Sequence, residues 1–158
     1  MMFKTHLAFS LLIGLLIYKI FTLTSFNLNP VFFFMLLLIG AGFPDIDMPK
    51  SKFGRKIRPL SDILYFVFGH RKFMHSFFFL VLISGLIYVL AGIYFLAFAI
   101  GFLTHVLLDG FSKEGINFFY PIKSEIKGPI RTNSFLEKLL FYGLVFVDVI
   151  IIYFILRW

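Results

Sequence analysis

Long apolar stretches, interrupted by two charged segments, organise this chain. The apolar stretches cover residues 6–22, 30–43, 73–90, 93–109 and 139–156. A membrane-spanning helix needs about 20 predominantly apolar residues, so the almost continuous run from 73 to 109 is too long for one helix. Gly92, in "LAGIY", marks the point where this run is expected to fold back. The pattern predicts five transmembrane helices, of which the second is somewhat short.

Two polar segments, residues 44–72 and 110–138, connect these helices on one side. The first segment contains a short apolar piece, Ile63 to Phe68, that is too short to cross a bilayer. We expect this piece to form an interfacial or re-entrant helix capped by Asp62. The chain is therefore predicted to be a single all-α domain, a polytopic membrane helical bundle of about five spans plus a short interfacial helix.

Composition supports this class and restricts the chemistry that the protein can carry out. The chain is 60% hydrophobic and 15% charged, with 25 Phe in 158 residues and a mean hydropathy of +0.96. These values lie far outside the averages of soluble proteins. The sequence has no cysteine, which excludes disulfides and thiolate metal sites. Any bound metal must have nitrogen and oxygen ligands.

The net charge of +7 predicts an orientation in the membrane. Lys and Arg residues are concentrated in the two polar segments, whereas the opposite connections, residues 22–27 and 89–94, carry no charge. By the positive-inside rule, the polar segments and the N-terminus are cytoplasmic and the C-terminus is outside. The cationic face is expected to attract anionic lipid headgroups. Nucleic-acid binding is not expected, because the basic loops lack interleaved aromatic residues and a recognisable binding fold.

Histidine and aspartate residues gather at the predicted cytoplasmic ends of four spans. All four histidines and three of the five aspartates lie there. The first span opens with His6, the second is followed by Asp45 and Asp47, His70 and His75 begin the third, and His105 and Asp109 end the fourth. A single His at a helix end is usually an interfacial anchor, and a single Asp often terminates a helix. Agreement among four separate spans favours a shared functional site.

The spacing of these residues suits a metal. His105 and Asp109 are four residues apart, on one face of a helix. In "PDID", the proline is expected to end the second span and leave both carboxylates free to turn inward. Imidazole with carboxylate suits Zn, or Mn or Fe(II) as alternatives. Seven candidate ligands exceed the need of one Zn, which predicts one or two ions: His6, Asp45, Asp47, His70, His75, His105 and Asp109.

The order of the motifs resembles a known family. "THLAFS", "GFPDIDMPKS", "GHRKFMHSFFF" and "GFLTHVLLDGFSKEGINFFYPI" follow one another as in the YdjM family of LexA-regulated, membrane-bound, predicted metal-dependent hydrolases. The resemblance implies a histidine and aspartate metal centre that is distantly similar to zinc-dependent phospholipase C. After the last aspartate, Ser112 and Gly115 keep the family pattern, whereas Lys113 and Glu114 depart from it. The matching site positions are His6, Asp45, Asp47, His70, Arg71, His75, Ser76, His105 and Asp109.

The leading functional hypothesis is a membrane-embedded, metal-dependent hydrolase that cleaves a phosphoester of a lipid at the cytoplasmic face. Asp45 or Asp47 would act as general base if it is not a ligand. Arg71 would orient the phosphate with help from Lys72, although both residues also fit simple positive-inside anchoring. The candidate substrate-binding set is Arg71, Lys72, Ser76 and Ser112. The alternatives are a transporter of metal ions and a non-catalytic membrane protein with a structural metal.

Two charged residues lie deep inside predicted spans. Lys19 interrupts the first span and Asp148 the fifth, at broadly similar depths. Charged groups within a bilayer usually pair with one another, which predicts an ion pair between them. Snorkelling of the Lys19 side chain to the interface is the alternative. The sequence leaves the oligomeric state open.

Overall fold

A computed structural model describes residues 1–24 and 27–157. Its α-helices are α1 (Phe3–Leu23), α2 (Pro30–Gly42), α3 (Arg58–Phe68), α4 (Phe77–Ala91), α5 (Phe95–Gly110) and α6 (Phe135–Arg157). Short 3₁₀ helices are η1 (Phe43–Asp47), η2 (Gly54–Ile57), η3 (Phe73–His75) and η4 (Gly92–Tyr94). The strands β1 (Ile116–Asn117) and β2 (Glu125–Ile126) pair antiparallel, with Ile116 opposite Ile126. The connection expected at residues 22–27 includes Ser25 and Phe26, which lie outside the described residues.

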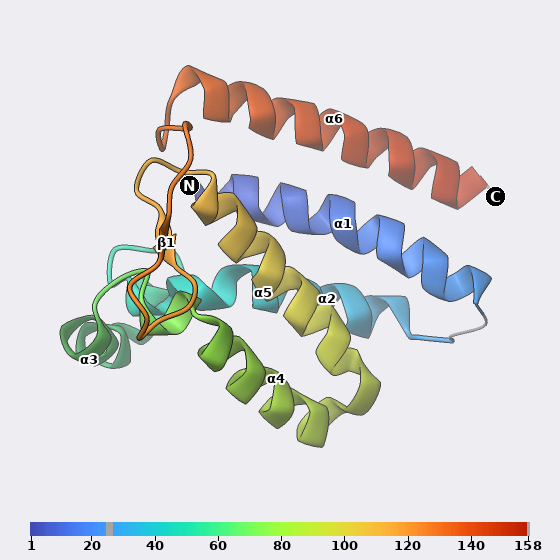
Figure 1. Cartoon of the computed structure of the whole chain (residues 1–158). Helices are drawn as coiled ribbons and strands as arrows, with labels where there is room; N and C mark the ends of the chain where they lie inside the picture. The colour runs from blue at the N-terminus through green and yellow to red at the C-terminus, as the bar shows by residue number, and fades with distance from the viewer. Residues whose placement is uncertain (25–26, 158) are drawn as a thin grey trace.

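Four segments of the described chain are long and apolar enough to cross a membrane: Phe3–Leu23, Pro30–Asp47, Phe77–Gly110 and Phe135–Ile155. The third is 34 residues long and contains both α4 and α5, which fold back on each other (Figure 1). Gly92 lies at this fold with φ of 58°, a left-handed conformation that glycine adopts at little cost. The predicted all-α membrane helical bundle is confirmed. Helices α1, α2, α4, α5 and α6 overlap the five predicted spans, although α4 begins at Phe77 and α6 at Phe135, four residues from the predicted starts.

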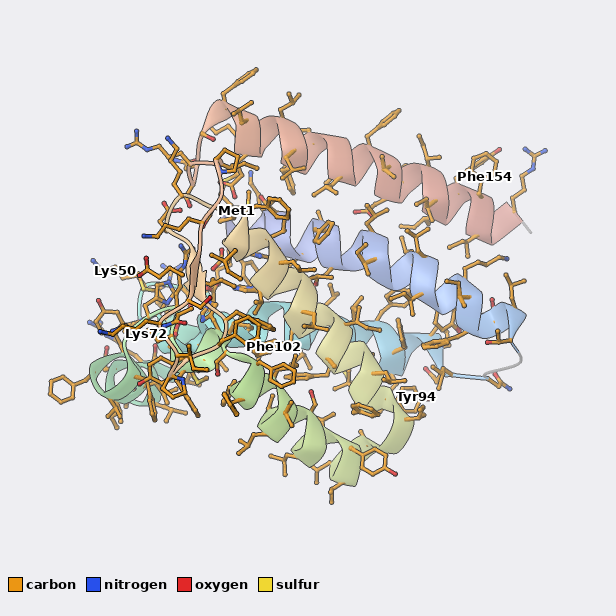
Figure 2. All side chains as sticks on the ribbon, in the orientation of Figure 1. Met1, Lys50, Lys72, Tyr94, Phe102 and Phe154 are labelled. Carbon is orange, nitrogen blue, oxygen red and sulfur yellow. The ribbon has the colours of Figure 1, made fainter. Side chains whose placement is uncertain are left out.

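One end of the bundle collects the polar connections (Figure 1). The N-terminal ends of α1, α4 and α6 lie there with the C-terminal ends of α2 and α5, next to α3 and the β1–β2 hairpin. In Figure 2 the labels of Met1, Lys50 and Lys72 mark this end, while Tyr94 and Phe154 lie towards the other. The candidate site therefore has contributions from four helices that meet at one end of the bundle.

Helices α2 and α5 approach each other so closely that their backbones touch. A Cβ atom added at Gly101 would lie 2.0 Å from the carbonyl oxygen of Leu37, and one at Gly40 would lie 2.2 Å from that of Phe98. Small residues allow such approach between membrane helices, where packing and not the hydrophobic effect drives association. This contact sets the position of α5 relative to η1, the short helix that follows α2.

A buried hydrogen bond between Ser10 and Thr104 joins α1 to α5. The Thr104 hydroxyl donates to the carbonyl oxygen of Gly101, 2.7 Å away, which leaves Ser10 as the donor between the two helices. Interhelical hydroxyl bonds of this kind stabilise membrane bundles. The bond lies one turn from His6 and one residue from His105, so it also keeps these two histidines at the same level.

Helix α6 is held at its N-terminal end by the buried carboxylate of Glu137. This group accepts hydrogen bonds from the backbone N–H of Met2, at 2.5 Å, and from that of Asn133, at 2.6 Å. The Ser134 hydroxyl accepts in turn from the N–H of Glu137, at 3.3 Å. The pattern Ser-x-x-Glu at a helix start is that of a capping box, here with Asn133 as the second donor. Glu137 therefore stabilises the start of α6 and ties it to α1.

Glu137→Ala is expected to destabilise the protein by about 1–3 kcal/mol, because the backbone N–H groups of Met2 and Asn133 lose a buried carboxylate acceptor. The measurement is thermal unfolding of the detergent-solubilised protein. Glu125→Ala is the matched control, since Glu125 is exposed and pairs only with Lys127, at 2.7 Å. Equal melting temperatures for the two variants would show that Glu137 does not anchor α6.

The structure confirms a short helix outside the bundle and corrects its start. Asp62 was expected to cap it, but α3 begins at Arg58, directly before Pro59, and its N-cap, Ile57, makes no side-chain cap bond. Proline favours the first turn of a helix, which moves the start upstream. Asp62 lies one turn inside and pairs with Arg58, at 3.7 Å. The helix exposes a large apolar face, as interfacial helices do: Leu60, Ile63, Phe66 and Val67.

The predicted ion pair between Lys19 and Asp148 is wrong. No ion pair joins them in the part of the chain that the structure describes, and the buried Asp148 has an oxygen without a hydrogen-bond partner. Lys19 instead lines a pocket between α1 and α6 with Ile151 and Phe154. Helical register explains the difference, because Ile151 lies about one turn beyond Asp148.

Candidate metal centre

The candidate ligands come from four parts of the chain that meet at the polar end of the bundle. The first turn of α1 contributes His6, η1 contributes Asp45 and Asp47, the segment before α4 contributes His70 and His75, and α5 contributes His105 and Asp109. Five of the seven side chains are at most 1% exposed. Asp45 and His70 are the more accessible pair, with side chains 17% and 25% exposed. The structure therefore brings all seven into one cluster with a buried side and an open side.

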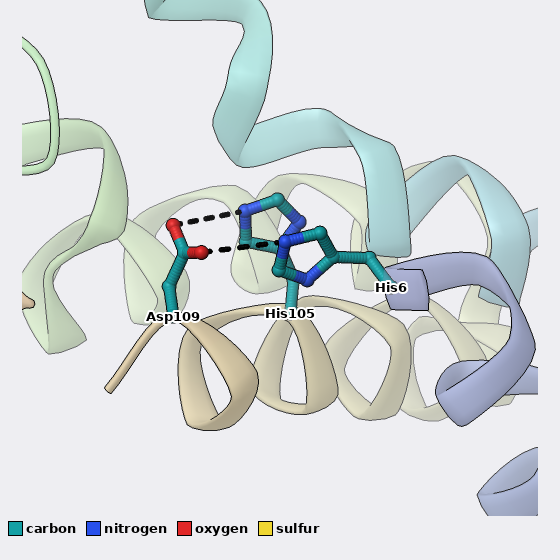
Figure 3. A group of neighbouring side chains, drawn as sticks. All are labelled: His6, His105 and Asp109. Carbon is teal, nitrogen blue, oxygen red and sulfur yellow. Dashed lines mark ion pairs between the residues drawn. The ribbon is translucent and has the colours of Figure 1, made fainter. Parts of the chain in front are cut away.

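Three imidazoles surround the carboxylate of Asp109. Nε2 of His6 lies 3.3 Å from Oδ1, while Nε2 of His75 and Nε2 of His105 lie 3.7 and 3.8 Å from Oδ2. Figure 3 shows His6 and His105 side by side, both directed at Asp109, and their rings stack with centroids 3.8 Å apart. Two ligands of a tetrahedral ion with bonds of about 2.0–2.1 Å are about 3.4 Å apart. The spacing suits ligands that share one ion.

Two ligand groups are possible, and they overlap. The first is His6, His105 and Asp109, and the second is Asp45, His75 and His105. In each group one nitrogen or oxygen atom from every residue lies within 4.8 Å of the others. Nε2 of His105 links the two groups, because it lies 3.8 Å from Oδ2 of Asp109 and also 3.8 Å from Oδ1 of Asp45. An ion bound by His105 is therefore within reach of ligands from both groups.

Hydrogen bonds behind the cluster orient the histidines. Nδ1 of His105 lies 2.7 Å from the carbonyl oxygen of Ala41, which only accepts. Nδ1 must donate, and Nε2 is left free to bind a metal. Asp47 lies 2.7 Å from Nδ1 of His70 and 3.5 Å from Nδ1 of His75. Asp47 and His70 belong to neither ligand group, and this geometry makes Asp47 a carboxylate that supports histidines from behind.

Several polar atoms of the cluster are buried without a hydrogen-bond partner: Nδ1 of His6, Nδ1 and Nε2 of His75, Nε2 of His105, and Oδ2 of Asp109. Burying such atoms unsatisfied is costly, and native proteins leave few of them. The cluster also holds three carboxylates, the guanidinium of Arg71 and the N-terminal ammonium of Met1, which lies 2.6 Å from Oδ1 of Asp109, so its net charge is −1 when the imidazoles are neutral. A divalent cation would satisfy the free nitrogens and offset this charge, so the residues fit a metal centre.

The Arg71 side chain contacts residues of the cluster. Its Nε lies 3.0 Å from Oδ2 of Asp109 and its Nη2 lies 3.1 Å from Oδ1, a two-point contact. Its backbone N–H donates to Asp47, at 3.3 Å, and its φ of 60° is unusual for a residue other than glycine. Nη1 also donates to the buried Ser112, at 3.3 Å. Arg71 thus contacts both oxygens of Asp109, and its role in binding substrate stays a prediction.

Glu114, which departs from the family pattern and was not selected as a site residue, is a neighbour of Arg71. Its carboxylate lies 3.8 Å from Nη1 of Arg71 and accepts from Thr132, at 2.9 Å. Burial would raise the pKa of Glu114, but hydrogen bonds from its own backbone and Thr132, together with the charge of Arg71, outweigh burial and lower it. Glu114 therefore stays ionised and balances the guanidinium on the side away from Asp109.

The sequence model of the YdjM inner membrane protein family matches residues 1–157. This chain belongs to the YdjM family. It is 32% identical over 123 residues to the uncharacterized protein YvsG of Bacillus subtilis strain 168, covering 75% of this chain and 77% of that protein. The inner membrane protein YdjM of Escherichia coli K12 and that of Shigella flexneri are each 33% identical over 94 residues. The matched region covers 55% of this chain and about half, 48%, of each of those two proteins. No solved structure matches the chain.

Membership of the YdjM family agrees with a membrane location, and the structure sorts the remaining predicted site residues. The Ser112 hydroxyl donates to the carbonyl oxygen of Asp109, at 2.7 Å, and supports Arg71. The Ser76 hydroxyl caps α4 by accepting from Phe79 N–H, at 3.2 Å, and donates to a backbone carbonyl. Lys72 is exposed and belongs to neither ligand group. Ser76 and Lys72 are therefore not part of the cluster.

Proposed function

We propose that this YdjM family member is a membrane-embedded, metal-dependent hydrolase that cleaves a phosphoester of a lipid or lipid-like substrate. The observation that carries the proposal is the buried cluster in which three imidazoles surround Asp109 while Asp45 faces outward. Nitrogen and oxygen ligands without thiolate suit zinc, with manganese or iron as alternatives. A bound ion would lower the pKa of a coordinated water to about 7 and polarise a phosphoryl oxygen.

Different residues of the cluster would bind the metal, act as general base and position the ligands. His6, His75, His105 and Asp109 would hold the ion, because they are buried and Nε2 of each imidazole lies 3.3 to 3.8 Å from a carboxylate oxygen of Asp109. Asp45 would take a proton from the attacking water as general base, since its carboxylate is the exposed one of the three. Neighbouring groups would keep these residues in position by contacting the side of each that faces away from the ion: Asp47 lies beside His70 and His75, and Arg71 lies against Asp109.

An accessible position favours hydrolysis over the two alternatives. A pocket of about 320 Å³ opens beside the cluster and is lined by Asp45, His70 and Arg71 among others. A purely structural metal is enclosed by protein ligands, whereas a catalytic site keeps a position for water and substrate. A transporter is expected to bind its ion near the membrane midplane, between broken helices. Here the cluster lies at one end of the bundle (Figure 1).

We also propose that this end faces the cytoplasm, with the N-terminus inside and the C-terminus outside. The distribution of Lys and Arg supports this orientation, because both polar segments that reach the cluster are basic. A lipid phosphoester in the inner leaflet would then lie level with the cluster.

The test is release of headgroup or phosphate from phospholipids by the purified protein loaded with zinc, manganese or iron. We expect turnover that chelation abolishes. Asp45→Asn is expected to slow it by about 10²–10⁴-fold, the usual contribution of a general base. The matched control is Asp62→Asn, which changes an exposed aspartate of α3 and leaves the rate unchanged. Absence of metal-dependent hydrolysis of any lipid would refute the proposed activity.

A further inference from the structure

The pocket beside the cluster has a strongly cationic wall. Besides Asp45, His70 and Arg71, it is lined by three basic residues of the loop between η1 and α3: Lys50, Lys52 and Arg55. Its volume of about 320 Å³ is at the lower end of the range of small-molecule sites, about 300–1,000 Å³. A pocket of this size suits a polar headgroup and not an acyl chain.

The basic loop is built against the candidate site. The Ser51 hydroxyl donates to the carbonyl oxygen of Asp45, at 2.7 Å, and accepts from the N–H of Gly54, at 2.8 Å. Gly54 packs so closely that an added Cβ would lie 2.1 Å from the carbonyl oxygen of Met48. The conformation of this loop is therefore tied to Asp45, and its three exposed cations line the pocket that Asp45 also lines.

These three cations have no acidic partner. Among the residues that the structure describes, no carboxylate lies within 4 Å of Lys50, Lys52 or Arg55. Nζ of Lys52 lies over the ring of Phe3, 5.2 Å from its centroid, and Nε of Arg55 donates to a backbone carbonyl, at 3.3 Å. Cations gathered without counter-charges repel one another, and a bound anion would remove this repulsion. Figure 2 shows Lys50 at the polar end of the bundle.

We propose that Lys50, Lys52 and Arg55 form an anion subsite that binds a phosphate monoester and presents it to the metal centre. This assignment rests on the proposed hydrolase function. The proposal assigns phosphate binding to these three residues and not to Arg71, whose guanidinium pairs with Asp109, or to Lys72. A phosphate monoester carries up to two negative charges, whereas a choline or ethanolamine headgroup would bring a cation into a cationic pocket. The subsite therefore selects anionic over zwitterionic headgroups.

Binding is the direct test, because it does not depend on turnover. Native mass spectrometry of the metal-loaded protein in uncharged detergent compares retention of phosphatidic acid with that of phosphatidylcholine. Calorimetry with glycerol phosphate tests the same chemistry in a soluble molecule. The variant is Lys50→Ala with Lys52→Ala and Arg55→Ala. The matched control removes three exposed cations of the other polar segment: Lys113, Lys123 and Lys138, each replaced by Ala.

The wild type is expected to prefer phosphatidic acid, and the pocket variant to bind it at least about tenfold more weakly, since each cation at a membrane surface contributes roughly a factor of five. The control variant should change binding by less than about twofold. If the wild type shows no preference between the two lipids but binds glycerol phosphate, and the pocket variant loses this binding, the ligand is a soluble phosphate ester. Equal weakening in both variants would overturn the subsite and leave only general surface attraction.

Metal content and hydrolysis, measured on the same three samples, separate the two proposals. If the hydrolase proposal fails, no sample turns over lipid, yet the pocket variant still loses phosphate binding. If the subsite fails, all three samples bind phosphate alike while they retain metal.

Discussion

Asp109→Asn is expected to abolish metal binding in a protein that still folds. Asp109 contacts three imidazoles and is the one carboxylate at the centre of the cluster. Asparagine keeps the shape of the side chain but offers a neutral, weaker ligand, and it removes the negative charge that Arg71 and the N-terminal ammonium of Met1 contact. Changes behind a metal site already cost about 10–100-fold in affinity, so the loss of a ligand should exceed about 100-fold.

The matched control is Asp148→Asn. Asp148 is also a buried aspartate of a long apolar helix, but it lies in α6, away from the cluster. Elemental analysis of both variants after detergent purification should show metal in Asp148→Asn at the wild-type level and almost none in Asp109→Asn. His105→Ala should match Asp109→Asn, because both ligand groups contain His105. Full metal content in Asp109→Asn would show that the metal does not bind at Asp109.

Gly101→Ala is expected to destabilise the bundle by about 3 kcal/mol, a fall in melting temperature of roughly 5–15 °C. The added methyl group would lie 2.0 Å from the backbone oxygen of Leu37, and a backbone cannot rotate away as a side chain can. Helices α2 and α5 would have to separate. Because α5 carries His105 and Asp109, the variant should also bind metal more weakly.

Gly85→Ala provides the control for this prediction. Gly85 lies inside α4, and a Cβ atom there meets nothing within 4 Å. Alanine should leave stability unchanged or raise it by up to about 1 kcal/mol, because glycine costs more conformational entropy on folding. Thermal unfolding followed by size-exclusion chromatography compares the two variants. Similar melting temperatures would show that the contact between α2 and α5 tolerates a larger residue.

The helices and the membership of the cluster could be predicted from the sequence, because both depend on local patterns. Apolar runs locate the spans, and Gly92 marks the turn between two of them. Topology then requires residues at matching ends of neighbouring spans to meet, which is why His6, Asp47 and His105 were selected together. The resemblance to the YdjM family was read from the same residues and is confirmed.

The contacts within the cluster could not be predicted. Nothing in the sequence indicates that the guanidinium of Arg71 meets the carboxylate of Asp109. The same holds for Asp47, whose carboxylate lies beside Nδ1 of His70 and Nδ1 of His75. The register between α1 and α6, which separates Lys19 from Asp148, is likewise set by packing. Such details depend on side-chain geometry between elements that are distant in sequence.

The pocket formed by the basic loop between η1 and α3 could not be predicted from the sequence either. A group of Lys and Arg after a span was read as a topology signal, which any cytoplasmic loop would give. What distinguishes Lys50, Lys52 and Arg55 is that they line one pocket with Asp45, and this follows from the Ser51 contacts that fold the loop back. No pattern of residue types predicts this loop conformation, so the proposed subsite could be inferred only from the structure.

X-ray absorption spectroscopy at the K-edge of the bound metal tests the central claim most directly, because it reports the ligands themselves. The protein, purified without chelators, should retain a metal with nitrogen and oxygen neighbours at about 2.0–2.1 Å and the outer-shell scattering of imidazole rings. That outer-shell signal should fall in His105→Ala. A protein that retains no metal, or a metal whose spectrum lacks imidazole, would contradict the centre of His6, His75, His105 and Asp109.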